Sequence, residues 1–201
     1  MVEIPSPLGG RSQSASFDRF DEFVPEHLPE PGPFLKEADV LDDEAHAAVH
    51  RVTREVFEAR GVYDMTFGYN LAKLNLDTRH PDAGYRYGEG DDDVLRAEFT
   101  PTTPFCPQSH TLTIGSFRAW NGLSERHDYE LVRVRVHPMH NEAERINRQL
   151  SDLEAEYRET GTLPDDPTSG SGPAPGSGER PSGLSGDTGS EEAGYGPGAP
   201  F

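Results

Sequence analysis

The chain of 201 residues has one cysteine, two lysines and a low share of apolar side chains. The lone Cys106 excludes an intrachain disulfide framework, a zinc ribbon and any single-chain site built from four thiolates. No run approaches the roughly 18–20 consecutive apolar residues of a membrane span, and the first ten residues lack the basic start and apolar run of a signal peptide. The sequence therefore predicts a soluble, cytoplasmic protein.

Positive charge is also scarce, since 36 acidic residues against 18 basic ones give a net charge of −18. A field of this sign repels nucleic acid and anionic lipid, so we expect neither a nucleic-acid nor a membrane partner. An acidic excess with only Lys36 and Lys73 as lysines favours a halophilic protein, adapted to molar salt that screens the self-repulsion. A GC-rich genome, which replaces lysine by arginine, is the alternative explanation.

Regular hydrophobic patterns are missing from both ends of the chain. Residues 1–38 are rich in proline and have no sustained apolar period, which predicts a disordered N-terminal arm. In this arm Phe17, Phe20 and Phe23 are either a short segment that docks on a partner or part of a mobile tail. Residues 161–201 are rich in Gly, Pro and Ser and predict a disordered acidic tail. Residues 39–160 remain as one foldable domain.

Hydrophobic periodicity places six elements in that domain. We expect a helix from Asp42 or Asp43 to Gly61, strands over 72–76 and 95–99, a helix from Pro107 to about Gly122, a strand over 132–136 and a helix from about Asn141 onward. The link between the first two strands, 78–92, is expected to be a solvated excursion. The order helix, strand, strand, helix, strand, helix predicts an α+β domain: a small three-stranded sheet with helices on one face.

Two details of this prediction concern exposure. Arg133 and Arg135 alternate with three valines and are expected to form the solvent face of the last strand. The last helix has an apolar stripe from Ala143 to Tyr157, at spacings of three and four residues. The core of the domain is the favoured place for this stripe, and a dimer seam is the alternative.

The segment Phe99 to Cys106, ending Thr-Pro-Phe-Cys and followed by Pro107, is the part of the chain with evident chemistry. If Pro107 is the first helical residue, Cys106 is the N-cap, where unpaired N–H groups and the helix dipole favour a reactive thiolate. Thr100, Thr102 and Thr103 supply hydroxyls either to a ligand near the sulfur or to local turns. The alternative for Cys106 is a small buried apolar residue without chemistry.

This run, FTPTTPFCP, together with the later HNEAERINRQLSDLE, resembles the small iron–sulfur cluster assembly proteins of the SufT/PaaD type, which include the eukaryotic cytosolic cluster-targeting factor. The resemblance covers about residues 94–155. It implies an α+β domain in which Cys106 matches the reactive cysteine of the family and His140 matches the histidine that opens the last helix. Where the family usually has an Asp-Pro-Glu-type motif, this chain has only Asp64.

What the resemblance implies is a non-catalytic factor in the maturation of iron–sulfur proteins. Cys106 would transiently bind iron or an iron–sulfur cluster, with Thr102 and Thr103 close to the cofactor and His140 as a further metal ligand. Client iron–sulfur proteins and cluster carriers would be its partners. Because one thiol cannot hold a cluster, the other ligands would come from a homodimer, from a partner, or from histidines such as His137.

Two other functions stay open. In a thiol-dependent enzyme Cys106 would be the nucleophile and His110, His137 or His140 the base, although the sequence places no third group to orient that base. In a plain interaction module Cys106 would be buried and structural.

Overall fold

The computed structural model describes residues 16–20 and 22–163. By its internal contacts the chain divides into two units, Met1–Pro164 and Asp165–Phe201, and the second of these lies outside the described residues. The predictions of disorder for residues 1–15 and for the tail beyond residue 163 therefore fall outside as well. No helix within the described part of the chain is both long enough and apolar enough to cross a membrane.

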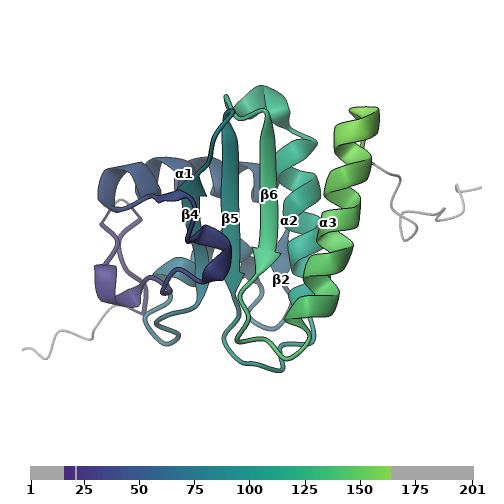
Figure 1. The fold of residues 1–201 in the computed structure, drawn as a ribbon. Helices are drawn as coiled ribbons and strands as arrows, with labels where there is room; N and C mark the ends of the chain where they lie inside the picture. Colours follow the sequence, from purple (N-terminus) through teal and green to yellow (C-terminus); the bar gives the residue numbers. More distant parts are fainter. Residues whose placement is uncertain (1–15, 21, 164–201) are drawn as a thin grey trace, which may run out of the picture. The chain divides into compact units, whose positions relative to one another are not determined.

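A mixed four-stranded sheet forms the centre of the domain (Figure 1). Its strands lie in the order β1 (Asp39–Val40), β4 (Gly84–Glu89), β5 (Val94–Thr100) and β6 (Leu131–Val136). The pairs β1–β4 and β4–β5 are antiparallel, whereas β5 and β6 are parallel, with Leu95 opposite Val132 and Phe99 opposite Val136. A separate hairpin joins β2 (Tyr63–Asp64) to β3 (Tyr69–Asn70). The α+β class is confirmed, but the sheet has one strand more than predicted.

Three α-helices occur in the described residues, close to where the sequence places them. Helix α1 (Asp43–Arg60) ends at Gly61, whose φ of 68° is readily adopted by glycine. Helix α2 (Ser109–Asn121) connects the parallel strands β5 and β6, and α3 (Ala143–Thr160) follows β6 and runs alongside it (Figure 1). The apolar stripe of α3 lies in the core, because Ala143, Ile146 and Leu150 are all buried.

The core lies between one face of the sheet and helices α1 and α2. Apolar side chains of β5 and β6 alternate onto this face, and Tyr85 and Tyr87 extend it onto β4. Both tyrosine hydroxyls are fully buried and bonded: Tyr85 donates to Ser116 of α2 (2.6 Å), and the hydroxyls of Tyr87 and Thr53 of α1 lie 2.8 Å apart.

The prediction was wrong in the segment between α1 and β5. Residues Leu71–Leu76 form the 3₁₀ helix η3 and not a strand, and all of them except Lys73 are buried. The expected solvated excursion contains β4, whose residues are buried except for Glu89. The side chain of Asn75 joins the two segments, since it accepts from Tyr85 N (2.7 Å) and donates to Tyr85 O (2.8 Å).

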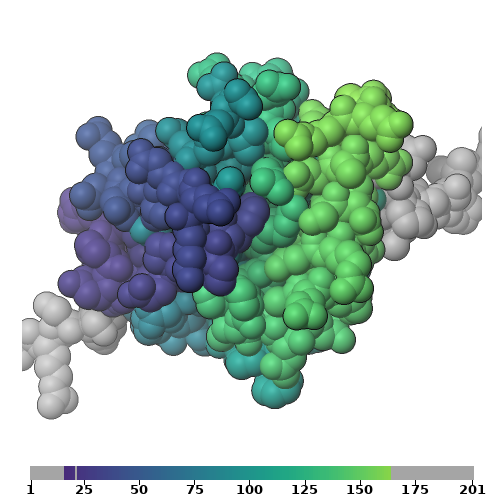
Figure 2. Space-filling model, viewed as in Figure 1, coloured from purple at the N-terminus to yellow at the C-terminus, as the bar shows by residue number. Residues whose placement is uncertain are grey.

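The largest correction concerns residues 16–38, expected as part of a disordered arm and here called the N-terminal strap. The strap packs on the domain (Figure 2) and includes the short 3₁₀ helices η1 (Pro25–His27) and η2 (Pro33–Leu35). Its Phe17 makes a β-bridge with Asp77, and Leu35 is fully buried. The strap has no periodic hydrophobic pattern, because it is rich in proline and poor in apolar residues. Its few apolar side chains nevertheless pack one by one on the domain.

The strap also explains why Arg133 and Arg135 are not a solvent face, as was predicted. The ring of Phe34 lies 5.3–5.7 Å from the guanidinium carbons of Arg96, Arg133 and Arg135. From α3, Glu154 forms ion pairs with Arg133 (Nε at 2.8 Å) and Arg135 (Nη2 at 2.6 Å), and Arg135 also donates a hydrogen bond to it. The second face of the sheet is thus polar and partly covered: Arg135 is only 7% exposed, whereas 30% of the Arg133 side chain is exposed.

Candidate functional site

Cys106 lies in the loop between the end of β5 and the start of α2. Proline residues at positions 101, 104 and 107 restrict the backbone of this loop. Two successive turns hold the cysteine: its N–H donates to Thr103 O, and its carbonyl accepts from Ser109 N, each at 3.3 Å. The cysteine is free and partly exposed, which argues against the alternative of a small buried apolar residue.

The position of Cys106 relative to α2 differs from the prediction. The helix begins at Ser109 with Gln108 as its N-cap, and Cys106 therefore precedes the cap by two residues. Pro107 lies in a turn before the helix and is not its first residue. The argument that the helix end activates the thiol required Cys106 itself at the cap, and it loses its basis because the dipole effect falls off within one turn.

His140 fixes the loop of Cys106 through its imidazole. Nδ1 accepts from the backbone N–H of Glu142 (3.1 Å), so the proton of the neutral ring is on Nε2, which donates to the carbonyl of Cys106 (3.0 Å). Both ring nitrogens are therefore in use. To bind a metal ion through Nε2, His140 would have to give up its bond to the Cys106 loop.

Among the histidines predicted as a base for the Cys106 thiol, His110 has the most suitable position. It lines a cavity of about 370 Å³ together with Cys106 and His140. Its Nε2 lies 2.7 Å from Oε1 of Gln149 on α3, which orients the ring. The rest of the wall consists of Pro104, Phe105, Pro107, Asn141, Glu142, Arg145 and Ile146. Arg145 donates a hydrogen bond to Glu142 and lowers the pKa of that carboxyl.

The other predicted site residues lie apart from this cavity. Neither Thr102 nor Thr103 is part of its wall, and Thr103 serves the local turn through its carbonyl. Thr100 is the buried last residue of β5. His137 accepts from Met139 N (3.1 Å) and lies beside Gly32 of the strap. Of the predicted residues, the structure brings only His110 and His140 into one cavity with Cys106.

Sequence reasoning missed two exposed apolar side chains, one of which directly precedes Cys106. Met65 and Phe105, 81% and 75% exposed, are the two large apolar side chains that are exposed in the described part of the chain. Gln108 joins their loops, because its side chain accepts from Met65 N (3.0 Å) and donates to the Thr66 hydroxyl (2.6 Å). The β2–β3 turn, ordered by Asp64 bonds to Thr66 N and Phe67 N, therefore lies against the cysteine loop. The sequence signal that could have indicated the exposed Phe105 is the run Pro104-Phe105-Cys106-Pro107, in which a large apolar residue precedes the single cysteine.

A mononuclear site complete in one chain finds no support in residues 16–20 and 22–163. No group of three or more His, Cys, Asp or Glu side chains there could hold a metal ion. A soft metal or a cluster at Cys106 would need ligands from a second molecule.

Comparison with known proteins corrects the resemblance drawn from FTPTTPFCP and the closing helix. No curated protein matches the chain. The family that matches is a domain of unknown function, DUF7998, and the match spans residues 15–164, so it includes the strap as well as the cysteine loop. Membership of the SufT/PaaD type was wrong, since a short proline–cysteine run and one helix pattern were too little to define a family. The chain belongs to the DUF7998 family.

Proposed function

We propose that this protein is a non-catalytic binding factor that docks a partner protein on the surface formed by Met65, Phe105 and Cys106. The partner completes the coordination of a soft metal ion or iron–sulfur cluster that the Cys106 thiol ligates transiently. The observation that carries the proposal is a partly exposed cysteine that follows the exposed Phe105, in a loop that Gln108 joins to the loop of the exposed Met65.

Each part of this surface has a physical reason to favour a partner. Large exposed apolar side chains gain free energy when a second protein covers them, and their clustering marks interaction sites. A thiolate is the ligand that selects iron–sulfur clusters, zinc and copper(I), so the metal is cargo that passes through the docked complex. The bond from His140 to the Cys106 carbonyl holds the loop in place and lowers the entropic cost of docking.

The docking test compares the wild type with Phe105→Ser and Met65→Ser in pull-downs at high salt from cells of the source organism. We expect both variants to lose the partner that the wild type retains. Arg126→Ala, which changes an exposed residue outside this surface, is the matched control and should retain it. Retention by all four proteins would contradict the docking surface.

The cargo test is anaerobic incubation with ferrous iron and sulfide, alone and with the captured partner. We expect visible absorption that depends on Cys106 only when the partner is present, and its loss in Cys106→Ser. Equal absorption by Cys106→Ser in that mixture would remove the thiol from metal binding and leave a pure docking function.

One observation favours a second candidate, a thiol-dependent enzyme. The Gln149 amide orients His110 in the cavity of Cys106, as the third member of a catalytic triad orients its base. Multiple turnover of a thioester that is abolished both by Cys106→Ser and by His110→Gln would support this alternative. A single stoichiometric reaction with the thiol would count against it.

A further inference from the structure

Two histidines of α1 are fully buried beneath the N-terminal strap. His46 and His50 are one helical turn apart, and their rings stack with centroids 5.8 Å apart at an interplanar angle of 17°. Neither ring nitrogen of His46 has a hydrogen-bond partner, while Nδ1 of His50 lies 3.2 Å from the Tyr87 hydroxyl. A fully buried imidazole without any partner is costly in free energy and calls for a reason.

Aromatic rings from two directions enclose this histidine pair. The strap contributes Phe23, whose ring lies edge-on at 4.9 Å from both imidazoles, and Phe20, at 5.8 Å from His50. From β4, Tyr87 lies 5.1 Å from His46 and 6.2 Å from His50. The sheet closes one side of the pair permanently, so the strap is the part whose removal would admit water.

A positive charge on either ring is unfavourable in this enclosure, because both imidazoles are fully buried. Burial lowers the pKa of His46 to about 2, and His50 and Arg86 of β4 contribute to this. Burial likewise lowers the pKa of His50 to about 3, opposed by the backbone of Ala72 in η3 and assisted by Arg54 of α1. Both histidines are therefore neutral while the strap is closed.

The charged side chains of the strap pair mainly with one another. Arg19 bonds Glu22, and His27 Nδ1 lies 2.7 Å from the Asp18 carboxylate. The other acids among the described residues of the strap's first part are Glu26 and Glu30. His46 and His50 are the titratable side chains that the strap and β4 bury completely, whereas His27 lies within the strap and already contacts the Asp18 carboxylate.

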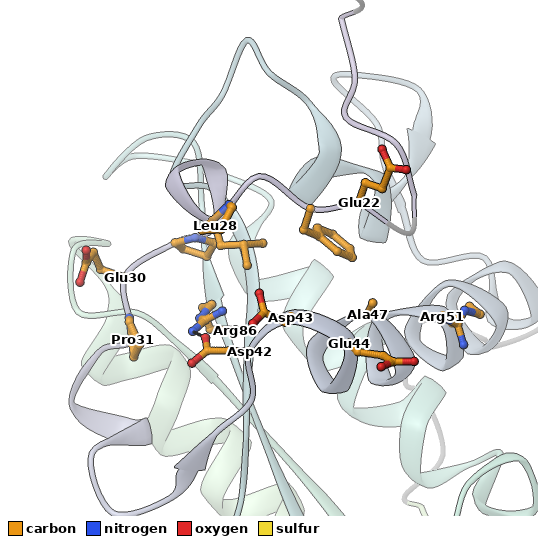
Figure 3. Close-up of a pocket in the computed structure, with 13 residues that line it drawn as sticks. Glu22, Leu28, Glu30, Pro31, Asp42, Asp43, Glu44, Ala47, Arg51 and Arg86 are labelled. Atoms are coloured by element: carbon orange, nitrogen blue, oxygen red, sulfur yellow. Dashed lines mark hydrogen bonds and ion pairs between the residues drawn. The ribbon is translucent and has the colours of Figure 1, made fainter.

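Few backbone bonds attach this part of the strap to the domain. Asp18 N donates to Leu76 O (2.7 Å), Thr78 N to Ser16 O (3.2 Å) and Asp82 N to His27 O (3.2 Å). Between residues 22–31 and the start of α1 lies a cavity of about 720 Å³, and Figure 3 shows Asp42, Asp43 and Arg86 there, opposite Leu28 and Pro31. The strap can therefore lift without breaking a sheet ladder.

We propose that the strap is an acid-released lid, which opens when His46 and His50 take up protons and uncovers Phe20, Phe23 and the buried face of α1. The direction of the pH effect follows from the difference in histidine pKa between the open and the closed form. Protons bind the open form at the ordinary histidine pKa of about 6.5 and the closed form only at far lower pH, so closure is complete above this value and weakens as the pH falls below it. Two protons shift the ratio of open to closed form by up to about 100-fold per pH unit.

Hydrogen exchange of the full chain, corrected for intrinsic rates, measures this opening directly. Between about pH 7.5 and about pH 5, at constant salt, we expect the protection of residues 16–31 to fall by up to about 1,000-fold, with β5 and β6 as the internal reference that stays protected. Unchanged protection of the strap would overturn the proposal. An equal fall in β5 and β6 would do so too, because it would mean acid unfolding of the whole domain.

The matched variants are His46→Phe and His127→Phe. His46 makes no hydrogen bond, so phenylalanine keeps the aromatic packing and removes only the titration; we expect the fall in protection to shrink to about 30-fold, from the one histidine that remains. His127→Phe, beside Trp120, should behave as the wild type. If His46→Phe does not fold, Phe23→Leu takes its place, and it must lower strap protection at both pH values. Wild-type behaviour of a folded His46→Phe contradicts the proposal.

Discussion

Gly32 is the residue at which the strap comes closest to the sheet. Its N–H donates to Oε1 of Glu98 (2.5 Å), and a Cβ built on it would lie 2.5 Å from Cδ2 of His137 and 2.6–2.7 Å from the Glu98 oxygens. The backbone at Gly32 is extended, with φ of −83°, so lack of space and not conformation demands glycine here. Burial raises the pKa of the Glu98 carboxyl, opposed by this bond and by His137.

Gly32→Ala should therefore destabilise the protein by about 1–3 kcal/mol, because the added methyl group overpacks a buried contact. Gly115→Ala is the matched control. Its Cβ would lie 3.7 Å from Val62, an ordinary contact, and alanine favours the helix by up to about 1 kcal/mol. Urea unfolding of both variants gives the comparison, and equal midpoints would contradict the overpacking argument.

Asp77 supports the strap from the other side. Its carboxylate accepts from the Tyr69 hydroxyl (2.8 Å) and from the guanidinium of Arg79 (2.6 Å). Burial by itself would raise the pKa of Asp77, but the bonds from Arg79 and Tyr69 outweigh it and lower the pKa to about 2. The ionised carboxylate is thus favoured by folding.

Asp77→Asn should lower the free energy of unfolding by about 2 kcal/mol near neutral pH, mainly through the bonds to Tyr69 and the backbone, since Arg79 is half exposed. Because the folded pKa lies below the unfolded one, the stabilisation is present above about pH 4 and is lost as the pH falls toward 2. Denaturant titrations should show the gap between wild type and variant closing over that range. A constant gap would mean that the charge of Asp77 plays no part.

At the scale of elements, Glu154 is the side chain through which α3 holds β6. It is 5% exposed and forms ion pairs with Arg133 and Arg135, so its loss would leave the buried Arg135 without its carboxylate partner. Burial lowers the pKa of Arg135, and Glu154 opposes this. The alternation of valine and arginine in β6 therefore has a buried valine face and an arginine face that is partly covered.

Glu154→Gln should destabilise the protein by about 3 kcal/mol, since it breaks a buried charge pair and leaves its partner uncompensated. Glu142→Gln, which removes an exposed pair with Arg145 at the start of the same helix, should cause no measurable change. Thermal or urea unfolding checks both. Equal effects would show that the position of Glu154 between the arginines is not what matters.

The elements that sequence periodicity predicted well are those whose apolar residues recur with one regular period, as the alternation of apolar and charged residues does in β5 and β6. Helices α1, α2 and α3 and strands β5 and β6 all appear at the expected places. Strand β4 was missed because it is buried on both sides: Tyr85 and Tyr87 face the helices, while Arg86 and two glycines occupy the positions that should read as solvent-exposed. The alternating apolar residues of η3 led to a wrong strand prediction, because nearly every residue of this 3₁₀ helix is buried and burial there follows no period.

The whole molecule carries a net charge of −18. Arginines that might offset it are partly used inside the protein, as Arg86 and Arg135 are. At about 0.1 M salt the screening length is about 10 Å and at about 1 M it is about 3 Å, so repulsion among surface carboxylates acts across the domain only in dilute salt.

We therefore expect the thermal midpoint of the wild type to rise between about 0.1 M and about 1 M KCl, as screening reduces self-repulsion in the folded state. NaCl at the same concentrations should give the same rise if screening is the cause. Equal midpoints at low and high KCl would contradict salt adaptation and favour a GC-rich genome as the reason for the scarcity of lysine.

The sequence alone determined the α+β class, the positions of the three α-helices and of strands β5 and β6, and Cys106 as the residue to follow, because these depend on local period, helix-ending residues and residue type. Only the tertiary structure decided that Cys106 lies before the helix cap, that His140 bonds the loop, and that Gln108 joins the loop of the exposed Met65 to that of Phe105 and Cys106. It also decided that the strap encloses two histidines. Contacts between residues far apart in sequence cannot be predicted from periodicity, because each depends on one individual side chain and not on a repeating pattern.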